Sequence, residues 1–450
     1  MFQRTSLAGG PRVISACLPG SRALTAAAYV LTGSRSEGKA ESGVAHFMEH
    51  LTFRGTAAFP TARAVSEAVE GVGGSSNAAT DRETTVYWVR LPLREAALGL
   101  EMLGELVLRP QLTDADVEHE RAVIIEEIRS YRDDASQHVY SVFDEAFFGD
   151  SPLGWEIAGT EASVAALSGE TIRGFWGRAY RPSNVVVAVV GDLAHEQAVD
   201  LVDHAFRPAA ASSPSPRPRP SPSQTSSPIP TPTQDPSAGP DLALAPAPER
   251  LPAGERLRVV EQDSAQAHLC LGLPALRRDH PDQWTLEMLD TILGDGSSSR
   301  LFQGLREEAG LAYDVHAFQV EYADCGVLEI YAGVAPERVT AATQAILGEL
   351  AKLRDERVPA AELDRARAYV RGRLELRLEE GRHLVSWLGG QEALHEQVLT
   401  AAEAIERLES VDAEQIRTLA ASLVQDAGLA AALVGPPGAA KGLEQVLHLP

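Results

Sequence analysis

The sequence predicts an α+β protein built from two similar units, and three observations support this fold class. Strand-like and helix-like segments alternate through both halves of the 450-residue chain. A Pro- and Ser-rich stretch, 207–255, separates the halves and lacks the apolar residues needed to form a core. The order of elements before this stretch partly repeats after it, which indicates an internal duplication. We therefore expect units at 1–206 and 256–450 joined by an extended linker. A partner-binding Pro-rich motif is the alternative for the stretch.

Runs of β-branched and apolar residues predict the strands of the first half, and spaced Leu, Val and Met residues predict its helices. Strands are expected at 12–18, 23–31, 84–91 and 184–190. Helices are expected at 44–53, 61–72, 93–108, from 114 onward, 140–148, 170–180 and 195–206. Gly55 is expected to close the first of these helices, and Thr113 to cap the one that begins at Asp114.

The second half carries a related series of elements. Strands are expected at 257–261, 268–273 and 428–435, with a strand-rich region at 318–332 that breaks near Asp324. Helices are expected at 284–293, 336–353 and 359–378. The helix at 284–293 stands where the first half carries the helix at 44–53.

Composition narrows the functional classes. The formal net charge of -23 argues against nucleic-acid binding through a basic surface. Three widely separated cysteines form no metal-ligand cluster and suggest no disulfide framework, which fits a reducing compartment. The first residues lack the apolar core of a signal peptide, and no apolar run approaches the ~20 residues of a membrane span. We therefore expect a cytoplasmic protein without a membrane span.

The helix expected at 44–53 contains the motif His46-Phe47-Met48-Glu49-His50. Residues four apart lie on one helix face, so the two imidazoles can bind one ion from the same side, with Glu49 beside them. Two neutral imidazoles and a nearby carboxylate suit a catalytic zinc ion. The order H-x-x-E-H is the inverse of the common H-E-x-x-H zinc motif. The alternative is a chance pairing of two histidines near a helix glutamate.

A third metal ligand is sought on the helix that begins at Asp114. Counting ~100° per residue gathers Val117, Ile124 and Ile128 on one buried side. Glu120 and Glu127 lie together at the edge of that stripe, whereas the neighbouring Glu126 points toward water. Glu127 is therefore the better candidate of its pair for a buried role as a ligand. The alternative is that Glu120 and Glu127 are ordinary surface glutamates.

These motifs together resemble the pitrilysin-type zinc peptidases, the family of insulin-degrading enzyme and the mitochondrial processing peptidases. The resemblance rests on residues 46–50 with the following 51–56, on 33–37 upstream, and on 297–302 and 305–313 in the second half. It covers nearly the whole chain except the linker, and by length the two-domain bacterial branch fits best.

The resemblance implies roles for the residues of the first half. It places the third zinc ligand on Glu127, about 77 residues beyond the second histidine. It places a supporting glutamate on Glu120, which would hold a ligand by a hydrogen bond. The implied ligands are thus His46, His50 and Glu127, with Glu49 as the general base for peptide hydrolysis.

The resemblance also implies substrate contacts. Asn77 and Ala78, after a glycine-rich turn, are expected just before an edge strand that pairs with extended peptide substrate. In the second half, Arg306 and Tyr313 are expected to bind the peptide near the zinc and to stabilise the oxyanion. Taken alone, Arg306 and Tyr313 could be an ordinary helix arginine and a core tyrosine.

The family fold implied here has two α/β units, each a mainly antiparallel sheet covered by helices, that form half of a clam-like chamber. The resemblance suggests a homodimer in which the second half of one subunit helps to close the site of the other. Three alternatives stay open: a catalytic subunit that needs a related partner chain, a non-catalytic assembly protein, and a zinc-dependent hydrolase that does not cleave peptides.

Overall fold

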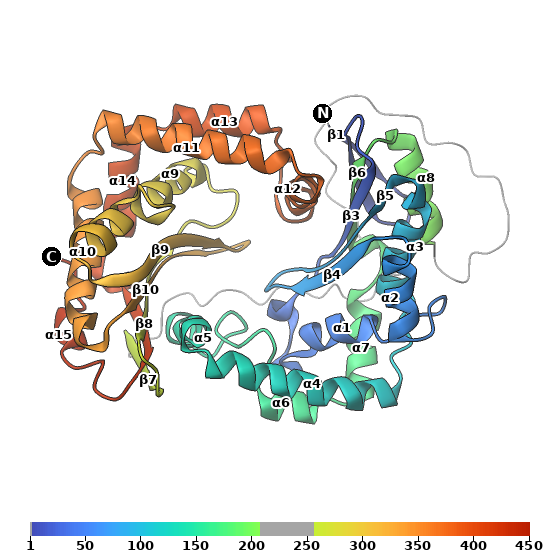
Figure 1. Cartoon of the computed structure of the whole chain (residues 1–450), viewed down its shortest axis with the longest axis horizontal. Helices are drawn as coiled ribbons and strands as arrows, with labels where there is room; N and C mark the ends of the chain where they lie inside the picture. Colours follow the sequence, from blue (N-terminus) through green and yellow to red (C-terminus); the bar gives the residue numbers. More distant parts are fainter. Residues whose placement is uncertain (1, 208–255) are drawn as a thin grey trace.

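The computed structural model describes residues 2–207 and 256–450 and contains two sheets flanked by helices (Figure 1). The predicted α+β class with two sheet-plus-helix units is confirmed. The predicted linker lies outside the described residues, apart from Arg207. No helix of the described part is long and apolar enough to cross a membrane.

The first sheet has six strands in the order β1-β2-β6-β3-β5-β4. All neighbouring pairs are antiparallel except β2 with β6. The strands are β1 (Phe2–Ser6), β2 (Arg12–Cys17), β3 (Ala23–Val30), β4 (Ser75–Thr80), β5 (Thr85–Pro92) and β6 (Val185–Gly191).

The second sheet repeats this topology without a counterpart of β1. Its order is β7-β11-β8-β10-β9, and only β7 and β11 are parallel. Taken in their order across the sheet, these strands correspond one by one to β2-β6-β3-β5-β4, which confirms the internal duplication. The strands are β7 (Leu257–Glu261), β8 (Ala267–Ala275), β9 (Ala312–Glu321), β10 (Gly326–Val334) and β11 (Ala430–Gly435).

Both halves of the chain contain helices that flank their sheet. Those before residue 207 are α1 (Val44–Thr52), α2 (Ala62–Glu70), α3 (Ala96–Leu108), α4 (Asp114–Asp133), α5 (Ala135–Phe148), α6 (Glu161–Ala166), α7 (Gly169–Ala179) and α8 (His195–Ala205). Those after residue 256 are α9 (Gln283–Gly294), α10 (Val339–Asp355), α11 (Ala360–Leu378), α12 (Gly381–Leu394), α13 (Ala401–Ser410), α14 (Ala413–Leu423) and α15 (Leu443–Val446). The sequence had not predicted β1, β4, α6 or the four helices after α11.

The two units exchange a helix. Helix α5 packs on β8 and β11 of the second sheet, and α12 packs on β3 and β6 of the first (Figure 1). Two glycines allow these close approaches: a Cβ on Gly272 would lie 2.2 Å from the Phe143 ring, and one on Gly389 would lie 2.3 Å from the Tyr29 ring. Each sheet is thereby covered on both faces, which is why β6, β10 and β11 are buried along their whole length. The boundaries at 206 and 256 stay a prediction.

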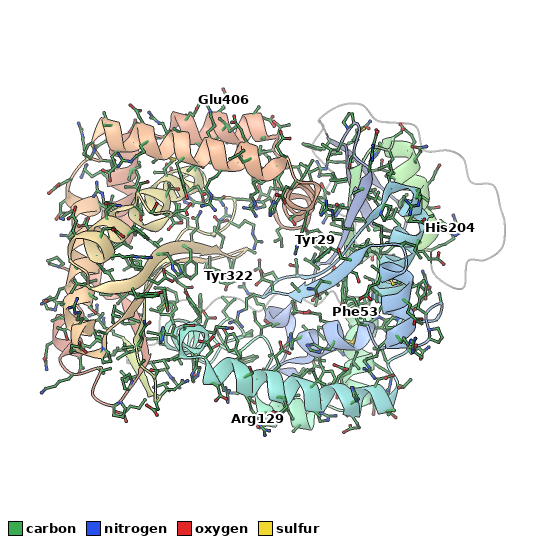
Figure 2. The ribbon with its side chains drawn as sticks, in the orientation of Figure 1. Tyr29, Phe53, Arg129, His204, Tyr322 and Glu406 are labelled. Atoms are coloured by element: carbon green, nitrogen blue, oxygen red, sulfur yellow. The ribbon has the colours of Figure 1, made fainter. Side chains whose placement is uncertain are left out.

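A buried ion-pair network joins the units where the β4–β5 and β9–β10 turns meet. Glu83 accepts hydrogen bonds from Arg35 (2.7 Å) and from Arg278 (2.5 Å), and Arg35 also pairs with Asp324. Arg35, Glu83 and Arg278 are all buried. Tyr322 lies at this junction, in the middle of the molecule (Figure 2), with the Arg35 guanidinium 5.8 Å from its ring centroid.

Candidate metal centre

Helix α1 is held at its N-terminus by a carboxylate from the preceding loop. Its first residue follows Gly43, whose φ of 94° is left-handed, and no side chain of that residue can cap the helix. Instead, the buried Glu37 accepts hydrogen bonds from the Gly43 and Ala45 amides, each 2.8 Å long. The prediction that Gly55 closes the helix is wrong, because the helix ends earlier, without a left-handed residue. Gly55 instead lies against the Pro60 backbone, where a Cβ would be 2.9 Å from its carbonyl oxygen.

The two faces of α1 differ in burial. The apolar face packs into the core of the first unit; its members are Val44, Ala45, Phe47, Met48 and Leu51. His46, Glu49 and His50 lie on the remaining face, which is only partly covered. The core packing therefore holds the helix while its three polar side chains face outward together.

The structure brings Glu127 of α4 to the two histidines of α1. Glu127 Oε1 lies 3.8 Å from His46 Nε2, and Glu127 Oε2 lies 3.2 Å from His50 Nε2. One ligand atom from each residue lies within 4.8 Å of the other two. Two ligands of a tetrahedral zinc ion with bonds of about 2.1 Å are about 3.4 Å apart. The donor set and its spacing therefore fit zinc, and we call these three residues the His–Glu cluster.

Glu120 lies behind His50, on the side away from Glu127. Its Oε2 atom is 3.1 Å from His50 Nδ1, so the ring is held between two carboxylates. The helix phase had favoured Glu127 over Glu126, and Glu127 is the less exposed of the two, at 52% against 72%, although neither is buried. Glu120, by contrast, is buried. Helix α4 packs against α1 with the face that carries Glu120. Glu127 is therefore left at the open side of the contact.

The charges of the cluster depend on these contacts. Burial opposes a proton on His50, but the hydrogen bonds with Glu120 and Glu127 outweigh it and raise the pKa to about 9. Burial and the neighbouring His50 lower the pKa of His46 to about 4. The hydrogen bond with His50 lowers the pKa of Glu127. At neutral pH one proton is therefore shared between His50 and its carboxylates, while His46 is a free base.

Glu49 is attached to the sheet by a contact that the sequence did not reveal. The Thr80 hydroxyl donates a 2.7 Å hydrogen bond to Glu49 Oε2. Burial raises the pKa of Glu49, and the bonds with Thr80 oppose this rise. The carboxylate is thus less acidic than usual and can exchange a proton nearer to neutral pH.

Asn77 and Ala78 lie in the edge strand itself and not just before it. The outermost strand of the first sheet is β4, which pairs only with β5 among the described strands. The strand expected at 84–91 is the interior β5. The error has a physical cause: the β4 sequence, from Ser75 to Thr80, has no large apolar or aromatic residue and is a strand because of its pairing with β5.

Arg306 and Tyr313 lie together but apart from the His–Glu cluster. Arg306 belongs to a short π-helix and Tyr313 to the start of β9, the edge strand of the second sheet. The Arg306 guanidinium lies 5.9 Å from the Tyr313 ring centroid, and Tyr313 is 73% exposed, so it is not a core tyrosine. In the described part of the chain, neither forms a hydrogen bond, ion pair or ring contact with a residue of α1 or α4. Figure 1 shows β9 and α1 on opposite sides of the molecule.

Two family models match consecutive parts of the chain. The model described as insulinase (peptidase family M16) matches residues 12–161, which include the cluster, Glu49 and Glu120. The model described as peptidase M16 inactive domain matches residues 166–370. This second stretch has no H-x-x-E-H motif.

Curated relatives named zinc proteases match the chain over nearly its full length. An uncharacterized zinc protease of Streptomyces coelicolor is 33% identical over 93% of this chain and 86% of its own. One of Mycobacterium leprae is 33% identical over 99% of this chain and 94% of its own. One of Bacillus subtilis is 29% identical over 97% and 99%, respectively.

Solved structures share the fold. A protease from Helicobacter pylori superposes with a TM-score of 0.84 at 22% identity, covering 97% of this chain and 99% of the other. A peptidase M16 inactive domain from Pseudomonas fluorescens gives 0.81 at 20% identity, covering 97% and 98%. On the family models and the full-length relatives, this chain belongs to the insulinase family of peptidases, peptidase family M16, whose relatives found here are named zinc proteases.

Proposed function

We propose that this protein is a zinc-dependent endopeptidase that hydrolyses extended or unfolded peptides. The observation that carries the proposal is the meeting of His46, His50 and Glu127 at zinc-ligand spacing, with Glu49 on the same helix face. Family membership and the zinc-protease names of the relatives support it. When bound, zinc would act as a Lewis acid that polarises the scissile carbonyl and acidifies the attacking water.

Each side chain of the site has a distinct task in this proposal. Glu49 takes the proton of the attacking water and returns it to the leaving amine, and its raised pKa suits both steps. Glu120 accepts a hydrogen bond from His50 Nδ1, which directs Nε2 of that ring toward the metal. Glu127 contributes its carboxylate from α4, so that two helices hold the metal.

The substrate would bind as an additional strand beside β4. Because β4 has a strand partner on one side only among the described residues, its other edge can hydrogen-bond an extended peptide. Asn77 and Ala78 lie in this strand, three and two residues before Thr80, which contacts Glu49. Main-chain pairing of this kind recognises extended peptides with little dependence on their sequence.

A second copy of the chain would supply Arg306 and Tyr313. Both are solvent-exposed and far along the chain from the cluster, while their types suit binding of a peptide carbonyl or oxyanion. In a homodimer, the second unit of one subunit would thus close the site of the other. A related partner chain could fill the same position.

The metal assignment is tested by zinc content together with cleavage of a quenched, unstructured peptide. We expect about one zinc per chain and loss of both zinc and cleavage in Glu127→Gln. Glu126→Gln is the matched control, because Glu126 is the next residue of the same helix and pairs with Arg129 at the surface. Zinc binding that survives Glu127→Gln unchanged would contradict the ligand set.

Shared sites are tested by mixing two inactive variants, Glu49→Gln and Tyr313→Ala. If each site combines two subunits, a mixed dimer contains one site with both native residues. Random mixing should then restore about a quarter of wild-type activity. If each site is formed within one chain, every site keeps one defect and no activity returns.

A further inference from the structure

Thr80 connects the general base of the proposed reaction to the edge strand. It is the last residue of β4 and pairs with Thr85 of β5, so its backbone is fixed by the sheet. Its side chain leaves the strand toward α1, where the hydroxyl reaches Glu49 Oε2 at 2.7 Å. Thus Thr80 joins the strand that would bind the peptide to the helix that carries the base.

This contact is well suited to hold the carboxylate in one orientation. A glutamate side chain ends in a freely turning carboxylate, because its last torsion has broad minima. In the described part of the chain, no side chain other than Thr80 donates a hydrogen bond to Glu49. With Oε2 engaged by the hydroxyl, the carboxylate is held in one orientation toward the attacking water.

We propose that Thr80 is a positioning residue that orients Glu49 and ties it to the peptide-binding edge of β4. The inference rests on the proposed function, and goes beyond it by naming a residue outside the H-x-x-E-H motif. Among the described residues, no hydrogen bond joins Thr80 to His46, His50 or Glu127, and its hydroxyl is bonded to Glu49. Its loss should therefore slow turnover without weakening either zinc binding or substrate binding.

The test compares Thr80→Val, which keeps the shape but lacks the hydroxyl, with Thr80→Ser, which keeps the hydroxyl. A hydrogen bond to a charged group corresponds to a factor of about 10 to 100 in rate. We expect kcat of Thr80→Val to fall by this factor, with KM and zinc affinity unchanged. Thr80→Ser should recover most of kcat. Ser422→Ala, which removes a hydroxyl that bonds only the Leu419 carbonyl within α14, should behave like the wild type.

The outcomes separate this inference from the proposed function. If Thr80→Val retains wild-type kcat while zinc-loaded Glu49→Gln is inactive, the positioning role is refuted and the peptidase proposal stands. If Thr80→Ser is as slow as Thr80→Val, the methyl group and not the hydroxyl matters, which also refutes it. If Thr80→Val loses zinc or changes KM together with kcat, the residue has a general structural role instead. If Glu49→Gln itself is fully active, both proposals fail.

Discussion

Zinc binding should compete with a proton on His50. In the metal-free protein the pKa of this residue is raised to about 9 from its ordinary value of 6.5, because hydrogen bonds with Glu120 and Glu127 outweigh the effect of burial. His46, with its pKa lowered to about 4, has no proton to lose. A histidine must be neutral at the nitrogen that binds metal, so zinc binding at pH 7 should release about one proton.

The difference between the pH and the pKa of His50 sets how strongly the proton weakens zinc binding. Two units below a pKa of about 9, the competing proton weakens the apparent zinc affinity by about 100-fold. The affinity should therefore rise about tenfold per pH unit from pH 7 to 9 and level off above this range. Competition with a chromophoric chelator of known pH dependence measures it, and calorimetry in two buffers of different ionisation enthalpy counts the protons.

A matched pair of variants isolates the cause. Glu120→Gln removes a carboxylate that holds the proton on His50, so the levelling-off should move to lower pH. Glu118→Gln, on the same helix and paired with Arg121 at the surface, should leave the profile unchanged. An apparent affinity that stays constant between pH 7 and 9, without proton release, would refute the assignment of the charge to His50.

Three further predictions concern stability. Burial raises the pKa of Glu37 from 4.5 to about 8, so the free energy of unfolding of the wild type should fall by a few kcal/mol relative to that of Glu37→Gln as the pH rises through this range. A difference in unfolding free energy between the two proteins that stays constant with pH in urea unfolding would contradict this. Glu83→Ala leaves the buried Arg278 without its carboxylate and should lower the free energy of unfolding by about 3–5 kcal/mol. A decrease below ~1 kcal/mol would contradict a stabilising role for the buried ion-pair network. Leu388→Ala, on the exchanged helix α12, should cost about 2–5 kcal/mol in the same assay if α12 stays docked on the first sheet.

Local signals in the sequence predicted the elements that position the metal. Thr113 caps α4 as expected, because a hydroxyl before a helix can satisfy a free backbone amide within three residues. His46 and His50 could be paired from sequence because both lie on one helix, whose geometry is independent of the rest of the fold. The helix phase also brought Glu120 and Glu127 together, but it could not tell which of them the packing of α1 would cover.

Contacts between distant segments escaped prediction. An apolar helix face shows that a helix is covered, but not by which sheet, and so the exchange of α5 and α12 was missed. Strand β4 was missed because its small and polar residues pair with β5 without a hydrophobic pattern of their own. Thr80 and Glu37 contact α1 through the tertiary fold, and a threonine or glutamate in a loop-like sequence carries no sign of such a partner.

The comparison of wild type with Glu49→Gln, both incubated with zinc, is the most direct test of the proposed ligands and of Glu49 as the general base. The quantities are zinc per chain and the rate of cleavage of a quenched, unstructured peptide. We expect about one zinc per chain in both proteins, and a fall in the cleavage rate by a factor of about 100 or more in the variant, as for loss of a general base. Full cleavage by the zinc-loaded variant, or no zinc in either protein, would contradict these assignments.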